Sequence, residues 1–85
     1  MLVLSRFLGI SIRMYYRDHT PPHFHAIYGE HEITVGIVTG VVEGRFPVRA
    51  LRMVLEWRDL RRDELITRWA DARAGDPLQP IPGLE

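Results

Sequence analysis

The chain has 85 residues, of which 11 are basic and 11 acidic, so its formal net charge is zero. This balance gives no indication of a nucleic-acid or membrane partner, and the length predicts a single domain. Because the chain has no cysteine, disulfides, thiolate catalysis and cysteine-ligated zinc are excluded.

The N-terminal segment, MLVLSRFLGISIRM, is rich in apolar residues, but Arg6 interrupts it and no small-residue cleavage site follows. It therefore predicts no signal peptide. The chain also has no apolar run of the roughly 20 residues that span a membrane. We therefore expect a cytoplasmic protein that has no membrane partner.

Apolar and polar residues alternate in three segments of the first half, as is typical of half-buried β-strands. These segments are residues 9–18, 23–29 and 32–40. Pro21 and Pro22 remove two backbone donors and indicate a turn or loop between the first two strands. Residues 41–44 leave open a short fourth strand.

The second half predicts helix. Pro47 suits a first helical position, and apolar residues then recur at helical spacing up to Trp57. A second helical pattern covers residues 63–75 and stops at Gly75. Whether one long helix or two shorter ones form stays open. Residues 76–85 contain three prolines and predict an extended tail, either loose or laid on a surface.

These elements predict an α+β fold with a three- or four-stranded antiparallel sheet, followed by one long or two shorter C-terminal helices packed on one face. Residues 1–75 would form the domain and residues 76–85 the tail. The sheet face opposite the helices would be open to solvent. It would carry a polar set of side chains, namely Arg13, Tyr15, Arg17, His23, His25 and Thr34.

The histidines stand in a distinctive string. Three of the four histidines of the chain fall within DHTPPHFH, residues 18–25. With SRFLGISIRMYYRDH before it and LRMVLEW after it, this string resembles a bacterial family known only as domain of unknown function 4160. The members look like small prokaryotic proteins, often encoded beside another small protein, in an arrangement similar to a toxin–antitoxin pair. The resemblance therefore implies a cognate small protein from a neighbouring gene as partner.

The first hypothesis for the site is a metal-independent ribonuclease or RNA-binding toxin of such a module, which needs no cofactor. His23 and His25 would be the general base and acid. Arg13 or Arg17 would hold the phosphate, and Tyr15 would stack on a base or donate a proton.

The second hypothesis is a metal site for zinc or another divalent transition metal. His23 and His25 lie two apart on a strand and point to the same side, and His19 would join them. Further ligands would come from His31, Glu30 or Glu32.

The third hypothesis is a protein-binding module without catalysis, in which the histidines bond to backbone carbonyls and to Asp18. A sheet edge or the tail would then engage a partner by strand addition. Because so short a chain buries only about 60–65% of its unfolded surface, a homo-oligomer is a further expectation.

Overall fold

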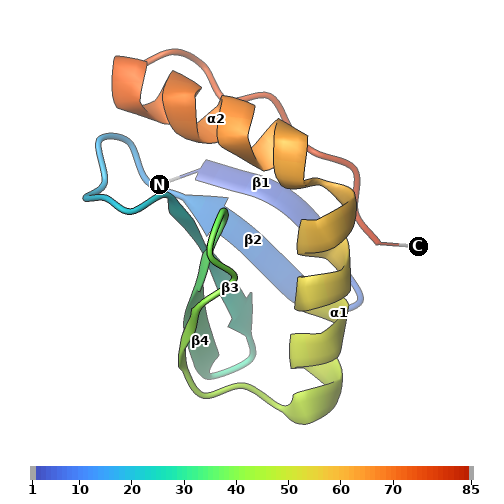
Figure 1. Ribbon diagram of the computed structural model, residues 1–85. Helices are drawn as coiled ribbons and strands as arrows, with labels where there is room; N and C mark the ends of the chain where they lie inside the picture. The colour runs from blue at the N-terminus through green and yellow to red at the C-terminus, as the bar shows by residue number, and fades with distance from the viewer. Residues whose placement is uncertain (1, 85) are drawn as a thin grey trace.

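The computed structural model describes residues 2–84, and within them five strands precede two helices (Figure 1). The elements are β1 (Leu2–Phe7), β2 (Ile10–Met14), β3 (His23–Tyr28), β4 (His31–Gly36), β5 (Val42–Gly44), α1 (Val48–Leu60) and α2 (Arg62–Ala74). The strands form one antiparallel sheet in chain order. The α+β class and the C-terminal helices are as expected, but the expectation of three or four strands is wrong, because the described sheet has five.

The additional strand is β1, which pairs with β2. Its register shifts between Val3 and Ser5, so that Leu4 has no partner in the ladder. At this bulge Leu4 and Ser5 are both buried. Because a bulge places an extra residue on one strand, residues 2–7 lose the strict alternation by which the other strands were recognised. The segment 9–18 is also shorter than predicted, since β2 ends at Met14 and Tyr16 lies in a turn.

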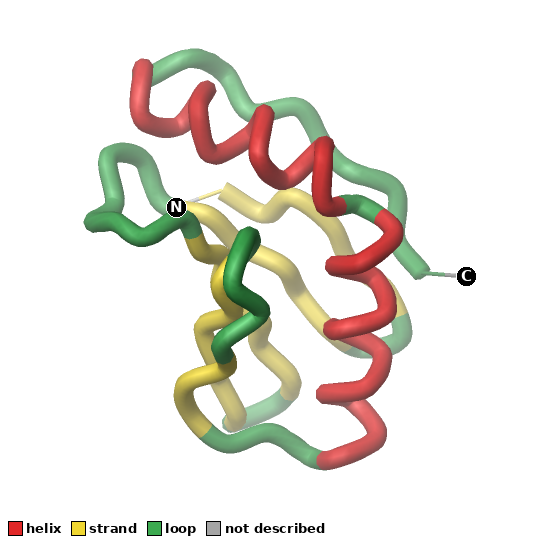
Figure 2. The backbone as a smooth tube through the Cα atoms, in the orientation of Figure 1, coloured by secondary structure: helices red, strands yellow, loops and turns green. Residues whose placement is uncertain are grey.

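The core lies between the sheet and the helices. The helices, red in Figure 2, meet at an angle and lie along one side of the sheet. Alternate residues of the strands point toward them, and this buried set includes Ile12, Met14, Phe24, Ala26, Ile33 and Val35. Trp57 of α1 is fully buried, and its ring lies 5.6 Å from that of Phe24 in an edge-on contact. The inward face predicted from alternation is thus the core face.

The two helices are separated at Arg61, which has φ −113° and ψ 18°. Its backbone N–H still donates to the carbonyl of Trp57, so the chain bends there without losing its hydrogen bond. The alternative of two shorter helices is therefore the one observed. The helix α2 ends at Gly75, which adopts a left-handed φ of 80° as predicted. Among residues 2–84, neither helix has the length and apolar character needed to cross a membrane.

The tail lies extended along the molecule. The backbone N–H of Ile81 donates to the carbonyl of Leu4 at 2.7 Å, and the indole N–H of Trp57 donates to the carbonyl of Pro82 at 2.8 Å. The Ile81 side chain is only 3% exposed. The tail therefore covers β1 and adds to the core.

Candidate functional site

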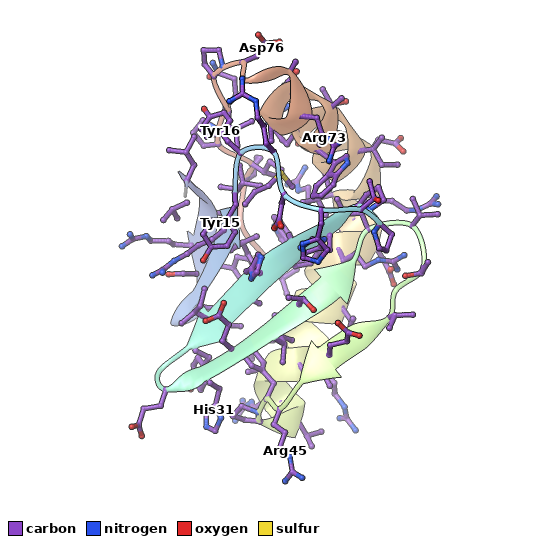
Figure 3. All side chains as sticks on the ribbon, turned by 90° about the vertical axis from the view of Figure 1, so that its left-hand side faces the viewer. Tyr15, Tyr16, His31, Arg45, Arg73 and Asp76 are labelled. Carbon is purple, nitrogen blue, oxygen red and sulfur yellow. The ribbon has the colours of Figure 1, made fainter. Side chains whose placement is uncertain are left out.

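The loop of residues 15–22 joins β2 to β3 and is held against the C-terminal end of α2. The Nη1 atom of Arg73 donates to the carbonyl of Asp18 at 2.7 Å. The backbone N–H of Arg17 donates to the carbonyl of Ala72 at 3.3 Å. Figure 3 shows Arg73 at this upper end of the molecule, with the loop in front of it. The loop thereby brings Asp18 over the start of β3.

Three side chains converge at this point. The Nε2 atoms of His23 and His25 lie 3.0 Å and 3.4 Å from the same oxygen, Oδ2 of Asp18. One ligand atom from each of the three side chains can be chosen so that all lie within 4.8 Å of one another. The three side chains are largely shielded, with exposed fractions of 9% for His23, 15% for His25 and 16% for Asp18. We call these residues the Asp-His-His cluster.

The other nitrogen of each ring is held by an acceptor. Nδ1 of His23 lies 2.8 Å from the carbonyl oxygen of Pro21. Because a carbonyl can only accept a hydrogen bond, this nitrogen carries the proton. Nδ1 of His25 lies 3.2 Å from Oε2 of Glu32, again an acceptor when ionised. In the neutral imidazoles, both Nε2 lone pairs therefore face the Asp18 carboxylate.

The cluster favours a positive species at its centre. Two nitrogen lone pairs that face a carboxylate oxygen repel it unless protons or a metal cation lie between them. Burial raises the pKa of the Asp18 carboxyl. This effect is more than offset by the backbone N–H of His19, the ring of His25 and the charges of His23 and His19. The pKa of the Asp18 carboxyl therefore lies below its ordinary value. The Asp18 carboxylate is thus kept in the anionic form that binds cations.

His23 is not on an open face as expected. Its ring lies 5.3 Å from that of Trp69, which belongs to α2. The expected solvent-exposed face is therefore wrong at this end of β3, because the loop and α2 close over it. His25, two residues further along, is partly exposed and lies directly opposite Thr34 in the sheet.

The other predicted metal ligands are dispersed. His19 is next to the cluster, but its side chain is 83% exposed, and its Nδ1 contacts the second oxygen of Asp18 at 2.9 Å. His31 lies at the opposite end of the β3–β4 hairpin, where Figure 3 shows it far below the loop. Glu30 lies in the turn beside it. Glu32 reaches the cluster only through Nδ1 of His25.

Of the other residues predicted for a ribonuclease site, Tyr15 and Arg13 lie next to His25, and Arg17 lies elsewhere. The ring of Tyr15 meets the ring of His25 edge-on, with centroids 4.6 Å apart. Arg13 lies opposite His25 in the β2–β3 register. Arg17 has a positive φ of 54°, and its guanidinium lies beside Gly75 at the end of α2.

A cavity of about 300 Å³ opens beside the two histidines of the cluster. The polar side chains that line it are His19, His23, His25, Thr34, Thr39 and Glu43. Gly36 lies opposite His23 and forms part of the wall. A Cβ atom at Gly36 would collide with the hydroxyl oxygen of Thr39 in its present position, so a larger residue there would displace the Thr39 side chain.

Asp18 was expected as a turn residue and as a hydrogen-bond partner of the histidines, and its contacts with His23 and His25 agree with that expectation. It was not considered as a metal ligand. Its spacing to the histidines, Asp-x4-His-x-His, was visible in the sequence. The missing information was the path of the loop, which depends on Arg73, a residue 55 positions further along the chain.

Comparison with known proteins identifies a family for this chain. No curated protein and no solved structure matched the chain. Residues 9–70 match the family described as "Domain of unknown function (DUF4160)". The match covers more than half of the chain and includes the whole Asp-His-His cluster together with Glu32. The chain therefore belongs to the DUF4160 family.

Proposed function

We propose that this chain is a metal-binding domain that holds a divalent transition metal, zinc or another first-row ion, between Asp18, His23 and His25. The observation that carries the proposal is the convergence of both Nε2 atoms on Oδ2 of Asp18, while both Nδ1 atoms are held by acceptors. A metal ion at this point replaces the repulsion among the three groups by three coordinate bonds.

Two of the three distances between ligand atoms are close to those of a tetrahedral metal site, and all three lie within 4.8 Å. Ligand atoms that share one tetrahedral ion at about 2.0–2.1 Å lie roughly 3.3 Å from one another. The distances from Asp18 Oδ2 to the two Nε2 atoms are 3.0 Å and 3.4 Å. Two imidazoles and one carboxylate form a donor set suited to zinc, iron and related divalent ions.

The surroundings of the histidines also support a metal. Histidines that ligate metals generally donate their other N–H to a carbonyl or carboxylate, which fixes the ring and its tautomer. The Pro21 carbonyl has this role for His23, and the Glu32 carboxylate has it for His25. Glu32, expected from the sequence as a ligand, is here a residue that orients a ligand.

This geometry supports metal binding better than a metal-independent ribonuclease. A ribonuclease of that kind needs its base and its acid directed at two different substrate oxygens. Here the Nε2 atoms of His23 and His25 both face Asp18. Of the two arginines expected to hold phosphate, Arg17 lies at the end of α2, whereas Arg13 lies opposite His25. RNA binding, a toxin–antitoxin context, a partner from a neighbouring gene and a homo-oligomer stay predictions.

The test is metal analysis of protein purified without a histidine tag. We expect about one transition metal ion per chain, and a metal-free form that binds Zn²⁺ or Co²⁺ again in calorimetric titration. Asp18→Asn, His23→Ala and His25→Ala should each weaken binding by more than about 100-fold, since each removes a ligand or its charge. His31→Ala removes a histidine distant from the cluster and should bind like the parent protein.

Two outcomes would overturn the proposal. One is metal-free protein that binds neither ion. The other is an equal loss of binding in His31→Ala and His25→Ala. An RNA-cleavage assay in excess EDTA separates the alternatives, because cleavage that survives EDTA and disappears in His23→Ala would support the ribonuclease hypothesis instead.

A further inference from the structure

We infer that the cavity beside the Asp-His-His cluster is a binding pocket for a small uncharged ligand that coordinates the metal through an oxygen or nitrogen atom. The inference rests on the proposed function. An ion held by Asp18, His23 and His25 has three protein ligands, which leaves at least one coordination position for water or a ligand. His23 and His25 line the cavity, whereas Asp18 does not. The open position therefore faces the cavity, away from the loop that carries Asp18.

The cavity wall carries hydrogen-bonding side chains in a row that starts at His25 of the Asp-His-His cluster. His25 of β3, Thr34 of β4 and Glu43 of β5 lie directly opposite one another in the sheet. They form a row from the cluster to the rim, with the half-buried Thr34 in the middle. Its hydroxyl both donates and accepts hydrogen bonds. Thr39 accepts a hydrogen bond from the backbone N–H of Val41 at 3.2 Å, so its own O–H remains available as a donor.

The charges of the site favour an uncharged ligand over a phosphate. Among the residues that the structure describes, no arginine lines the cavity. Glu43 lines it, and Asp18 and Glu32 stand directly behind the two histidines. These carboxylates balance the charge of a divalent ion, so the pocket has no excess of positive charge for an anionic substrate. Its volume of about 300 Å³ suits a small molecule.

The pocket is preformed because α1 holds its wall. The guanidinium of Arg58 donates to the carbonyls of Gly36, Ile37 and Val38 at 2.8–3.2 Å. The backbone N–H of Ile37 donates to the carbonyl of Pro22 at 3.0 Å. The turn that carries Thr39 is thus tied both to α1 and to the start of β3. A pocket fixed before binding loses less entropy when a ligand enters it.

The test uses the full chain loaded with Co²⁺, whose visible absorption reports changes in coordination, and imidazole as a neutral probe. We expect a saturable spectral change with cobalt still bound at one ion per chain. Thr34→Phe should fill the pocket and weaken imidazole binding by more than tenfold, while cobalt affinity stays within about twofold. Thr34→Val keeps the shape and loses the hydroxyl, which should cost roughly two- to tenfold in imidazole affinity. Thr67→Val, on the outer side of α2, should match the parent protein.

The outcomes separate this inference from the proposed function. Failure to bind cobalt contradicts the metal site itself. Cobalt binding with no spectral response to imidazole, or with the same response in Thr34→Phe, overturns the pocket alone. Inorganic phosphate serves as the anionic comparison. If phosphate binds more tightly than imidazole and Thr34→Phe abolishes this binding, the pocket exists but its assignment to uncharged ligands is wrong.

Discussion

His23 Nε2 lies 3.0 Å from Asp18 Oδ2, while the other nitrogen of the same ring donates to the Pro21 carbonyl at 2.8 Å. The ring is therefore held from both sides by oxygen atoms within a segment of six residues. Because the Pro21 carbonyl fixes a proton on Nδ1, Nε2 is the nitrogen of this ring that would bind a cation. The predictions below follow from this relationship and from the contacts that support it.

Removing metal should lower thermal stability. A metal at 100 times its Kd stabilises the folded state by about 2.7 kcal/mol, and a domain of this size gains about 4–8 °C per kcal/mol. Zinc should therefore raise the Tm of the metal-free protein by roughly 10–20 °C. EDTA should reverse the rise, and differential scanning calorimetry measures both changes. An equal rise in Asp18→Asn would show that zinc acts elsewhere.

Glu32→Gln should weaken metal binding without unfolding the protein. Glu32 accepts a hydrogen bond from His25 Nδ1 at 3.2 Å, and the side-chain amide is a weaker acceptor than the carboxylate. Losses for such supporting residues are typically 10–100-fold, and we expect about tenfold by calorimetric titration. Glu30→Gln is the matched control, because Glu30 lies in the neighbouring turn and should leave affinity unchanged. Equal losses in the two variants would indicate only a general effect of charge.

Arg73→Ala should weaken metal binding although Arg73 lies on α2 and is not itself a ligand. Its hydrogen bond to the Asp18 carbonyl fixes the loop, so we expect metal affinity to fall by roughly tenfold. Tm of the metal-free protein should change little, because Arg73 is exposed. Arg73→Lys, which keeps a donor and the charge, should recover part of the affinity. If affinity and metal-free stability fall together in Arg73→Ala, the residue is structural and does not position Asp18.

Stability of the metal-free protein should fall in acid because of Asp18. The pKa of its carboxyl is lower in the folded protein than its ordinary value, which is about 3.9 in an unfolded chain. The carboxylate therefore stabilises the folded state above that pH, and this contribution is lost as the pH falls through the lower, folded-state pKa. Urea unfolding from pH 6 to pH 3 should show the parent protein losing its advantage over Asp18→Asn. A difference that is constant with pH would contradict this assignment.

Ile81→Ala should destabilise the protein although Ile81 belongs to the tail. Its side chain is 3% exposed and packs in the main core. Comparable truncations in protein cores cost about 2–5 kcal/mol, and chemical denaturation measures the loss. Gln79→Ala, two residues earlier and exposed, should stay within about 0.5 kcal/mol of the parent protein. If the tail did not contribute to stability, both variants would have the same free energy of unfolding as the parent protein.

Alternation predicted the parts of the fold that follow a regular period. Phe24 and Ala26 point inward and His25 outward, as the segment 23–29 indicates. The strand β1 was missed because the bulge at Leu4 breaks its period. The sheet therefore has one strand more than the largest number expected. A bulge depends on how two strands fit together, and this information is not in either strand alone.

The sequence indicated the segment that carries the candidate site, but not which side chains meet there. Residues 18–25 were identified, and His23 and His25 do converge. The third member, Asp18, belongs to the cluster because the loop of residues 15–22 folds back over the start of β3. His31 and Glu30 do not reach the cluster, because they lie at the turn end of the β3–β4 hairpin, away from His23. These outcomes depend on tertiary contacts such as that between Arg73 and Asp18, which spacing along the chain does not specify.

The contact between α2 and the loop also has a consequence for the order of assembly. The strands pair with their neighbours in the chain, so the hairpins can form while the polypeptide is still being synthesised. The residue that anchors the Asp18 loop comes 55 positions later, in the last turn of the last helix. The histidines of β3 can therefore take their places in a nascent chain before Arg73, which anchors the Asp18 loop, has been added. If Asp18, His23 and His25 bind an ion as proposed, high-affinity uptake would follow the synthesis of α2, and a chain that lacks α2 would bind the ion more weakly.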